Sequence, residues 1–159
     1  MKAGVLTVSD GVARGDRADE SGEVLEQLLQ ADGHDVTRRV VPDEAREIAE
    51  AIEELTEACE LVVTTGGTGV APRDVTPEAT ASVVERQVPG IAEAIRSDAI
   101  GRTPHGMLSR GVAGVRRAAV VVNLPGSPGG CRDGYAVVRE ALPHAVRLLA
   151  GEQGGHRQT

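Results

Sequence analysis

Short apolar runs alternate with longer amphipathic segments along most of this chain. Four runs rich in Val, Leu or Thr end at Ser, Pro or Gly, which predicts strands over residues 3–8, 34–41, 61–65 and 118–124. Elsewhere, apolar residues recur every three or four positions, as on one face of a helix. This periodicity predicts helices that begin near residues 21, 43, 76, 89 and 132.

Capping residues refine the predicted helix ends. Ser21 is expected to cap the first helix and Gly33 to close it. Thr76 is expected to cap a later helix, with Pro77 at its first position. The remaining expectations are a loop over 12–20, a short strand or hairpin within 107–115, a final helix over 132–150 kinked at Pro143, and a frayed tail over 151–159.

Strands that alternate with helices predict an α/β sandwich on a mostly parallel sheet, in one domain over residues 1–150. In open sheets of this kind, ligands bind beyond the carboxyl ends of the strands. A site is therefore expected in the polar segments that directly follow the strands. These segments are residues 7–10, 42–44, 64–69 with 73–74, and 123–127.

The run GGTG at residues 66–69 follows a predicted buried strand. Glycine at such a turn lets the backbone approach a ligand and direct N–H groups at an anion, which suggests phosphate or pyrophosphate binding. The run is not a dinucleotide-binding fingerprint, because Pro72 stands where a third glycine is needed. A tight turn without a ligand is the alternative interpretation.

Asp43 and Asp74 are the acids of interest in these segments. Carboxylates beside a bound phosphate are typical ligands of Mg²⁺, which predicts a metal site between them. The alternatives are local: Asp43 begins a helix and would cap it, and Asp74 would pair with Arg73 or cap a turn.

Composition excludes several classes of function. Lys2 is the only lysine among 17 basic residues and precedes every glycine, which excludes a Walker-type phosphate loop and disfavours a Schiff-base enzyme. One Tyr, no Phe or Trp, and a net charge of -7 disfavour nucleic-acid binding. Cys59 and Cys131 lie far apart and are expected to be reduced thiols. No apolar run approaches the ~18 residues of a membrane span, so we expect a cytoplasmic protein without membrane contact.

Several motifs in register resemble one known family. TTGGTG, RDVTPEAT, VPGIAEAIR, MLSRGVAG and NLPGSPGG follow one another in the order and spacing of the MogA/MoaB family of molybdenum-cofactor biosynthesis. LTVSD near the start and VPDE at 41–44 also match, so the resemblance covers residues 3–150. It implies a three-layer α/β/α sandwich that forms a homotrimer, with a hexamer as the alternative.

The activity implied by this resemblance is that of a molybdopterin adenylyltransferase. Such an enzyme uses Mg²⁺ to transfer AMP from ATP to the terminal phosphate of molybdopterin, and it releases pyrophosphate. A metal-insertion protein of the MoeA type would receive the adenylyl-molybdopterin. Two alternatives are a non-catalytic carrier or scaffold module that binds molybdopterin, and a pyrophosphatase-like activity on a nucleotide.

Carried over residue by residue, the resemblance assigns the functional acids and Mg²⁺ ligands to Asp43 and Asp74. The implied phosphate-, pterin- and nucleotide-binding residues are Thr7, Ser9, Gly66, Gly67, Thr68, Gly69, Ser109, Asn123, Pro125, Gly126 and Ser127. Two departures concern substrate contacts: Gly129 and Gly130 stand where many relatives have Lys, and residues 11–20 lack an expected aromatic. We therefore expect amides, hydroxyls and metal to bind the triphosphate, and aliphatic side chains and backbone to hold the rings.

Overall fold

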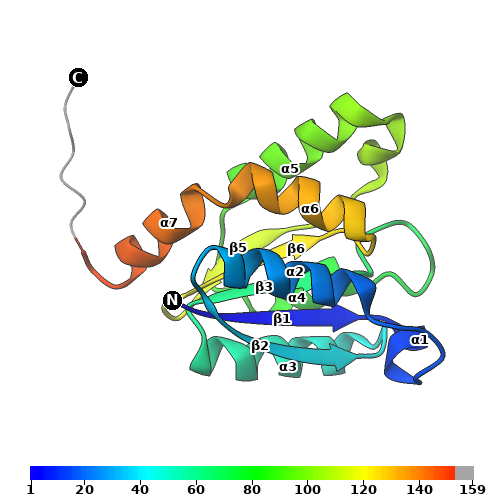
Figure 1. The fold of residues 1–159 in the computed structure, drawn as a ribbon, viewed down its shortest axis with the longest axis horizontal. Helices are drawn as coiled ribbons and strands as arrows, with labels where there is room; N and C mark the ends of the chain where they lie inside the picture. The colour runs from blue at the N-terminus through cyan, green and yellow to red at the C-terminus, as the bar shows by residue number, and fades with distance from the viewer. Residues whose placement is uncertain (153–159) are drawn as a thin grey trace.

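The computed structural model describes residues 1–152, and its strands form one six-stranded sheet (Figure 1). The strands are β1 (Lys2–Val8), β2 (Asp35–Val41), β3 (Leu61–Thr65), β4 (Arg86–Gln87), β5 (Ala113–Arg116) and β6 (Ala119–Leu124). The helices are α1 (Asp10–Ala13), α2 (Glu20–Ala31), α3 (Ala45–Ala58), α4 (Thr76–Val83), α5 (Pro89–Arg102), the 3-10 helix η1 (Pro104–Leu108), α6 (Pro128–Val138) and α7 (Ala141–Leu149).

The sheet has the order β2-β1-β3-β6-β5-β4. Its first four strands run parallel, β5 is antiparallel to β6, and β4 is antiparallel to β5. The expected mostly parallel sheet is therefore confirmed, and the antiparallel strands lie together at one edge. The four predicted strands match β1, β2, β3 and β6 to within about a residue at each end.

Helices cover both faces of the sheet, which confirms the three-layer sandwich (Figure 1). Successive strand residues point to opposite faces, so Val62 of β3 packs toward α3 and α4 while its neighbours Leu61 and Val63 pack toward α2, α5, α6 and α7. The larger core, on the second of these faces, includes Leu25, Cys131 and Tyr135. Both faces of β3 are buried, as expected for a central parallel strand.

One predicted loop and one predicted helix cap are wrong. The segment predicted as a loop over 12–20 begins inside α1, whose cap Ser9 accepts the Val12 N–H at 3.2 Å. Asp19 rather than Ser21 caps α2, because its carboxylate accepts the Gly22 N–H at 3.0 Å.

Thr76 also differs from its predicted role as a cap. Helix α4 begins at Thr76 itself, and its cap position is Val75. The Thr76 hydroxyl donates to the Gly66 carbonyl at 2.9 Å, and its N–H donates to the Gly67 carbonyl at 3.1 Å. Thr76 thus ties the start of α4 to the glycine turn that follows β3.

The predicted final helix is two helices. Helix α6 begins at Pro128, with Ser127 as its cap, and ends at Val138; α7 begins at Ala141. Pro143 has no N–H to donate to the carbonyl of Arg139, four residues earlier, so the interruption falls just before the proline rather than at it. Apart from Gly151 and Glu152, the predicted tail lies outside the described residues.

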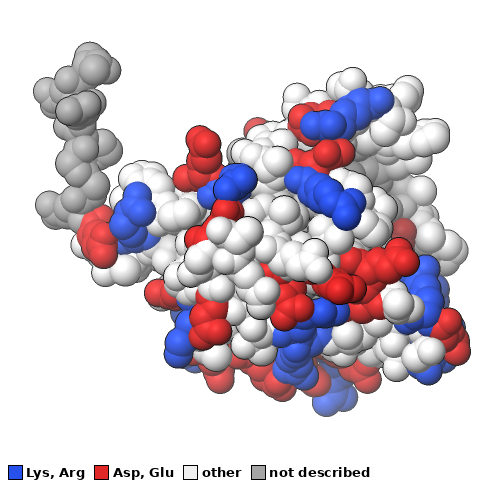
Figure 2. Space-filling model, viewed as in Figure 1, with Lys and Arg blue, Asp and Glu red and all other residues white. Residues whose placement is uncertain are grey.

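The predicted strand or hairpin within 107–115 is partly confirmed, since η1 ends at Leu108 and β5 forms a hairpin with β6. The two-residue strand β4 had no signal in the sequence. Cys59 and Cys131 are both free, as predicted, and both are buried. Acidic and basic side chains are interspersed over the face in Figure 2.

None of the helices within residues 1–152 is long and apolar enough to cross a membrane.

Candidate functional site

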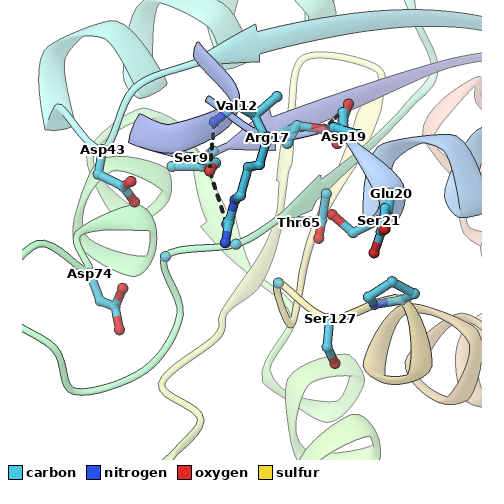
Figure 3. A pocket seen from close by; sticks show the side chains of 17 residues that line it. Ser9, Val12, Arg17, Asp19, Glu20, Ser21, Asp43, Thr65, Asp74 and Ser127 are labelled. Carbon is cyan, nitrogen blue, oxygen red and sulfur yellow. Dashed lines mark hydrogen bonds between the residues drawn. The ribbon is translucent and has the colours of Figure 1, made fainter. Parts of the chain in front are cut away.

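A cavity of about 480 Å³ opens at the carboxyl ends of the parallel strands. Because β1, β2, β3 and β6 all run in the same direction, the polar segments that follow them meet at one edge of the sheet, as predicted. The cavity is lined by Thr7, Val8, Ser9, Val12, Arg17, Ala18, Asp19, Glu20, Ser21, Asp43, Thr65, Gly66, Gly67, Asp74, Gly126, Ser127 and Pro128. Figure 3 shows Asp43 and Asp74 on one side of it, with Thr65, Ser21 and Ser127 on the other.

Eight of the predicted site residues line this cavity. They are Thr7, Ser9, Asp43, Gly66, Gly67, Asp74, Gly126 and Ser127. Five others do not line it: Thr68, Gly69, Ser109, Asn123 and Pro125. A cavity therefore does lie at the predicted edge of the sheet, and the five remaining residues are not part of its wall.

Asn123 is one of these five, and its side chain is held in the interior. Its amide Nδ2 donates to the hydroxyls of Thr64 at 2.9 Å and Thr80 at 3.0 Å, and its Oδ1 accepts the Val112 N–H at 3.2 Å. These bonds fix β6 against β3, α4 and the segment before β5. Asn123 thus holds together β3 and β6, the strands whose following turns line the cavity.

The glycine turn after β3 approaches the end of β1 very closely. Gly66 has φ 99°, and a Cβ at this position would overlap the carbonyl oxygen of Val8. Gly126 brings the turn after β6 close as well, since a Cβ there would lie 3.2 Å from the Gly66 Cα. The Gly66 N–H already donates to the Leu124 carbonyl at 3.3 Å. Gly66 therefore closes the three turns against one another rather than offering its amide to a ligand.

Asp43 is not a helix cap. Helix α3 has Glu44 at its cap position, with no side-chain cap bond, and Asp43 instead faces the end of β1. Its Oδ2 accepts the Asp10 N–H at 2.8 Å, and its own N–H donates to Asp10 Oδ1 at 3.0 Å. This reciprocal pair joins the segment after β2 to the start of α1.

Arg73 does not pair with Asp74. Its guanidinium instead binds Asp10 through Nε at 2.9 Å and Nη2 at 3.0 Å, and it reaches Glu44 at 2.9 Å. The hydrogen bonds from Arg73 hold the pKa of Asp10 below its usual value. The loop that carries Asp74 is therefore attached to the segments after β1 and β2.

The carboxylate of Asp74 is held by its own turn, and the backbone carbonyl of Asp74 is held by Arg110. Asp74 Oδ2 accepts the Ala71 N–H at 3.1 Å. One carboxylate oxygen therefore caps a local turn, as the alternative interpretation expected. Arg110 donates to the Gly69 carbonyl at 2.7 Å and the Asp74 carbonyl at 2.8 Å, and it also pairs with Glu78. Both ends of the loop are thereby fixed, and Asp74 is presented at the cavity.

Asp43 and Asp74 form no ion pair within the described residues, whereas Asp10 and Glu44 beside them share Arg73. Burial raises the pKa of Asp43, and the charges of Asp10 and Asp74 raise it further. Residues 1–152 contain no cluster of three or more His, Cys, Asp or Glu side chains that could hold a metal. Two carboxylates suit Mg²⁺, which commonly takes one or two from the protein and fills its remaining positions with phosphate oxygens and water.

A family model described as "Probable molybdopterin binding domain" matches residues 4–144. The chain belongs to this molybdopterin-binding family. It is 37% identical over 153 residues to the molybdopterin adenylyltransferase of Helicobacter pylori, a match that covers 93% of this chain and 87% of that protein. It is 40% identical over 158 residues to gephyrin of Dictyostelium discoideum, which covers 92% of this chain but only 22% of gephyrin.

Solved structures of family members have the same fold. The molybdopterin biosynthesis enzyme MoaB of Thermus thermophilus superposes with a TM-score of 0.88 at 43% identity, covering 95% of this chain and 97% of that one. The resemblance inferred from the motifs is therefore confirmed, and it extends over nearly the whole described chain.

The side of the cavity formed by residues 17–21 was missed from sequence. Asp19 Oδ2 accepts the Thr7 hydroxyl at 2.9 Å and the Arg38 guanidinium at 2.7 Å, while its Oδ1 caps α2. This network fixes Thr7 and the start of α2 at the cavity wall. The sequence did carry a signal, because Asp19 stands three residues before Gly22, the spacing at which a cap residue accepts the N–H of the third helical residue. The signal was not recognised because several other charged residues lie in the same segment.

We predict that Gly66→Ala destabilises the fold far more than an ordinary glycine substitution. The positive φ costs about 1–2 kcal/mol for any side chain, and the overlap with the Val8 carbonyl adds backbone displacement, for a total of about 3 kcal/mol or more. Gly33→Ala is the matched control, because Gly33 has φ 81° with no atom within 4 Å of the added Cβ. Urea unfolding measures both, and an equal loss in the two variants would contradict the close-approach argument.

Proposed function

We propose that this chain is a molybdopterin adenylyltransferase, which transfers AMP from ATP to the terminal phosphate of molybdopterin. The observation that carries the proposal is that Asp43 and Asp74 lie on one side of a cavity at the strand ends and form no ion pair within residues 1–152. Curated relatives with this activity support it over 93% of the chain. The site is polar, and Val8, Val12, Ala18 and Pro128 supply apolar contacts for the two ring systems.

In the proposed reaction, a terminal phosphate oxygen of molybdopterin attacks the α-phosphorus of ATP. The new P–O bond forms as the bond to the bridging oxygen breaks, and pyrophosphate leaves with that electron pair. No covalent enzyme intermediate is required, so the protein contributes positioning and charge neutralisation. Asp43 and Asp74 would hold Mg²⁺, which would offset the negative charge on the phosphates.

Hydroxyl groups at the cavity would orient the substrates. Ser9 Oγ accepts the Val12 N–H, and Ser127 Oγ accepts the Gly130 N–H at 3.1 Å. A hydroxyl that accepts a bond keeps its own proton, so both serines can still donate to a ligand oxygen. Thr7 differs, because its hydroxyl already donates a hydrogen bond to Asp19. Its role is to hold the cavity wall in place.

The alternative function is a carrier or scaffold module that binds molybdopterin without transferring AMP. The similarity to gephyrin, of which the chain spans 22%, is the reason to retain this alternative. The acids favour the enzyme, since a binding module has no need of two carboxylates without ion-pair partners beside the phosphate site. We also propose a cytoplasmic location for this enzyme and hand-over of its product to a metal-insertion protein of the MoeA type.

Incubation with Mg²⁺, ATP and molybdopterin separates these functions. We expect adenylyl-molybdopterin and pyrophosphate to form in equal amounts, measured by incorporation of labelled AMP and by pyrophosphate release. A carrier would bind molybdopterin and release no pyrophosphate. A pyrophosphatase-like enzyme would release pyrophosphate from the nucleotide without labelling the pterin.

We predict that Asp74→Asn abolishes adenylyl transfer while molybdopterin binding is largely retained. Asn keeps an oxygen that can accept the Ala71 N–H, so the turn is preserved while the charge for Mg²⁺ is lost. The expected fall in kcat is at least about 100-fold, the scale reached when a single electrostatic group of an active site is removed. Glu50→Gln, which removes a charge paired with Arg46 on α3, is the control. Equal turnover by wild type and Asp74→Asn would exclude a metal-ligand role.

We further propose that the chain assembles as a homotrimer through α5 and η1. Only Ile95 of α5 is buried, while Ile100, Met107 and Leu108 are exposed at 43%, 63% and 51%. Exposed apolar side chains that gather on one surface mark protein interfaces. The family resemblance implies that the partner bound at this surface is another copy of the chain.

Leu108→Asp is predicted to shift the assembly toward monomer, because a carboxylate in an apolar interface would lose hydration without a partner. Light scattering after gel filtration measures the mass. Leu148→Asp is the matched control, since Leu148 is also 51% exposed but lies on α7. A monomeric wild type, or an equal effect of both substitutions, would refute the proposed surface.

A further inference from the structure

Arg17 is the only basic side chain among the residues that line the cavity. It comes from the segment between α1 and α2, and its guanidinium extends to the centre of the site (Figure 3). Its Nη2 donates to Ser9 Oγ at 3.1 Å. Ser9 is itself fixed, because its hydroxyl oxygen caps α1 by accepting the Val12 N–H. The tip of Arg17 is therefore directed inward by a residue of the strand end.

Gly11 makes room for the stem of Arg17. A Cβ at position 11 would lie 3.3 Å from Arg17 Nε and 3.4 Å from its Cδ and Cγ, tighter than most such contacts. The arginine stem thus lies across the glycine of α1 while its tip reaches Ser9. Two separate contacts, one along the stem and one at the tip, define the direction of a side chain that is otherwise exposed.

The charge of Arg17 is not matched by a protein carboxylate. Within the described residues it forms no ion pair, whereas Arg14 in the same segment pairs with Asp16, and Arg38 behind the cavity wall pairs with Asp19. Figure 3 places the Arg17 guanidinium between the Asp43–Asp74 side of the cavity and the Thr65–Ser127 side. A cation held at the centre of a cavity with donors still available suits an anionic ligand.

We propose that Arg17 is the side chain that binds a phosphate group of the substrate in this cavity. A guanidinium presents a planar fork of N–H donors that matches two oxygens of a phosphate, and it stays charged at any physiological pH. The sequence has no lysine at the carboxyl end of any strand, and Arg17 supplies the positive charge that such a lysine would provide. The proposal rests on the proposed adenylyl transfer for the identity of the phosphate, which belongs either to ATP or to molybdopterin.

Calorimetric titration with inorganic pyrophosphate tests the proposal without reference to turnover. Arg17→Ala is expected to weaken pyrophosphate binding by about tenfold to a hundredfold, the effect of removing a charge-assisted hydrogen bond from a binding site. Arg17→Lys should recover part of the affinity, because the charge is kept and the fork is lost. Arg14→Ala is the matched control, since it removes the same charge from the same segment outside the cavity.

Steady-state kinetics then identify the phosphate. A rise in KM for ATP alone places Arg17 on the triphosphate, and a rise in KM for molybdopterin alone places it on the pterin phosphate. If the wild type binds pyrophosphate in an Arg17-dependent manner but transfers no AMP, the proposed function fails while this inference survives. Unchanged pyrophosphate affinity in Arg17→Ala, an equal loss in Arg14→Ala, or no binding by the wild type would overturn it.

Discussion

The site depends on one steric constraint, the contact of three backbone turns at the ends of β1, β3 and β6. Gly66 lies so close to the Val8 carbonyl that a side chain has no room, and a Cβ at Gly126 would make a tight contact with Gly66. Parallel strands bring their carboxyl ends to one edge, but that alone would leave side chains between the turns. Glycine removes them, and the backbone itself becomes the floor of the cavity. The hydroxyls and carboxylates around this floor come from residues adjacent to the turns.

A second layer of polar contacts holds the rim in place. Asp10 and Asp43 exchange N–H···carboxylate bonds, Arg73 attaches the Asp74 loop to Asp10, and Arg110 fixes the carbonyls at both ends of that loop. Each contact joins segments far apart in the sequence. A site on loops needs such supports, because catalytic groups must be held within a fraction of an ångström. These contacts position the segments that carry both acids, even though the rim lies outside the sheet.

Local patterns predicted the parts of this protein that depend on local physics. The strands and their common direction followed from apolar runs such as residues 61–65 and from alternation with helices. The glycine turn and the two acids followed from their position after strands. Long-range pairings could not be predicted in this way: nothing near Arg73 indicates that it binds Asp10 rather than Asp74. Asp19 was missed because several acids in one segment compete for the same cap, and only the tertiary bonds to Thr7 and Arg38 select it.

Paired and unpaired charges are distributed unevenly around the cavity. The carboxylates that support the rim have guanidinium partners, as Asp10 has Arg73 and Asp19 has Arg38. Four other charged residues that line the cavity have no ion-pair partner within the described residues: Asp43, Asp74, Glu20 and Arg17. Charges that only stabilised the fold would gain most by pairing with one another, since an unpaired charge near a low-dielectric wall loses hydration without compensation. The acids Asp43 and Asp74 on one side and the Arg17 guanidinium beside them match a ligand of the opposite arrangement, a metal cation bound to a phosphate anion. On the proposed function, Mg²⁺ and a substrate phosphate together would complete the electrostatics that the free protein leaves open, and binding of one would favour binding of the other.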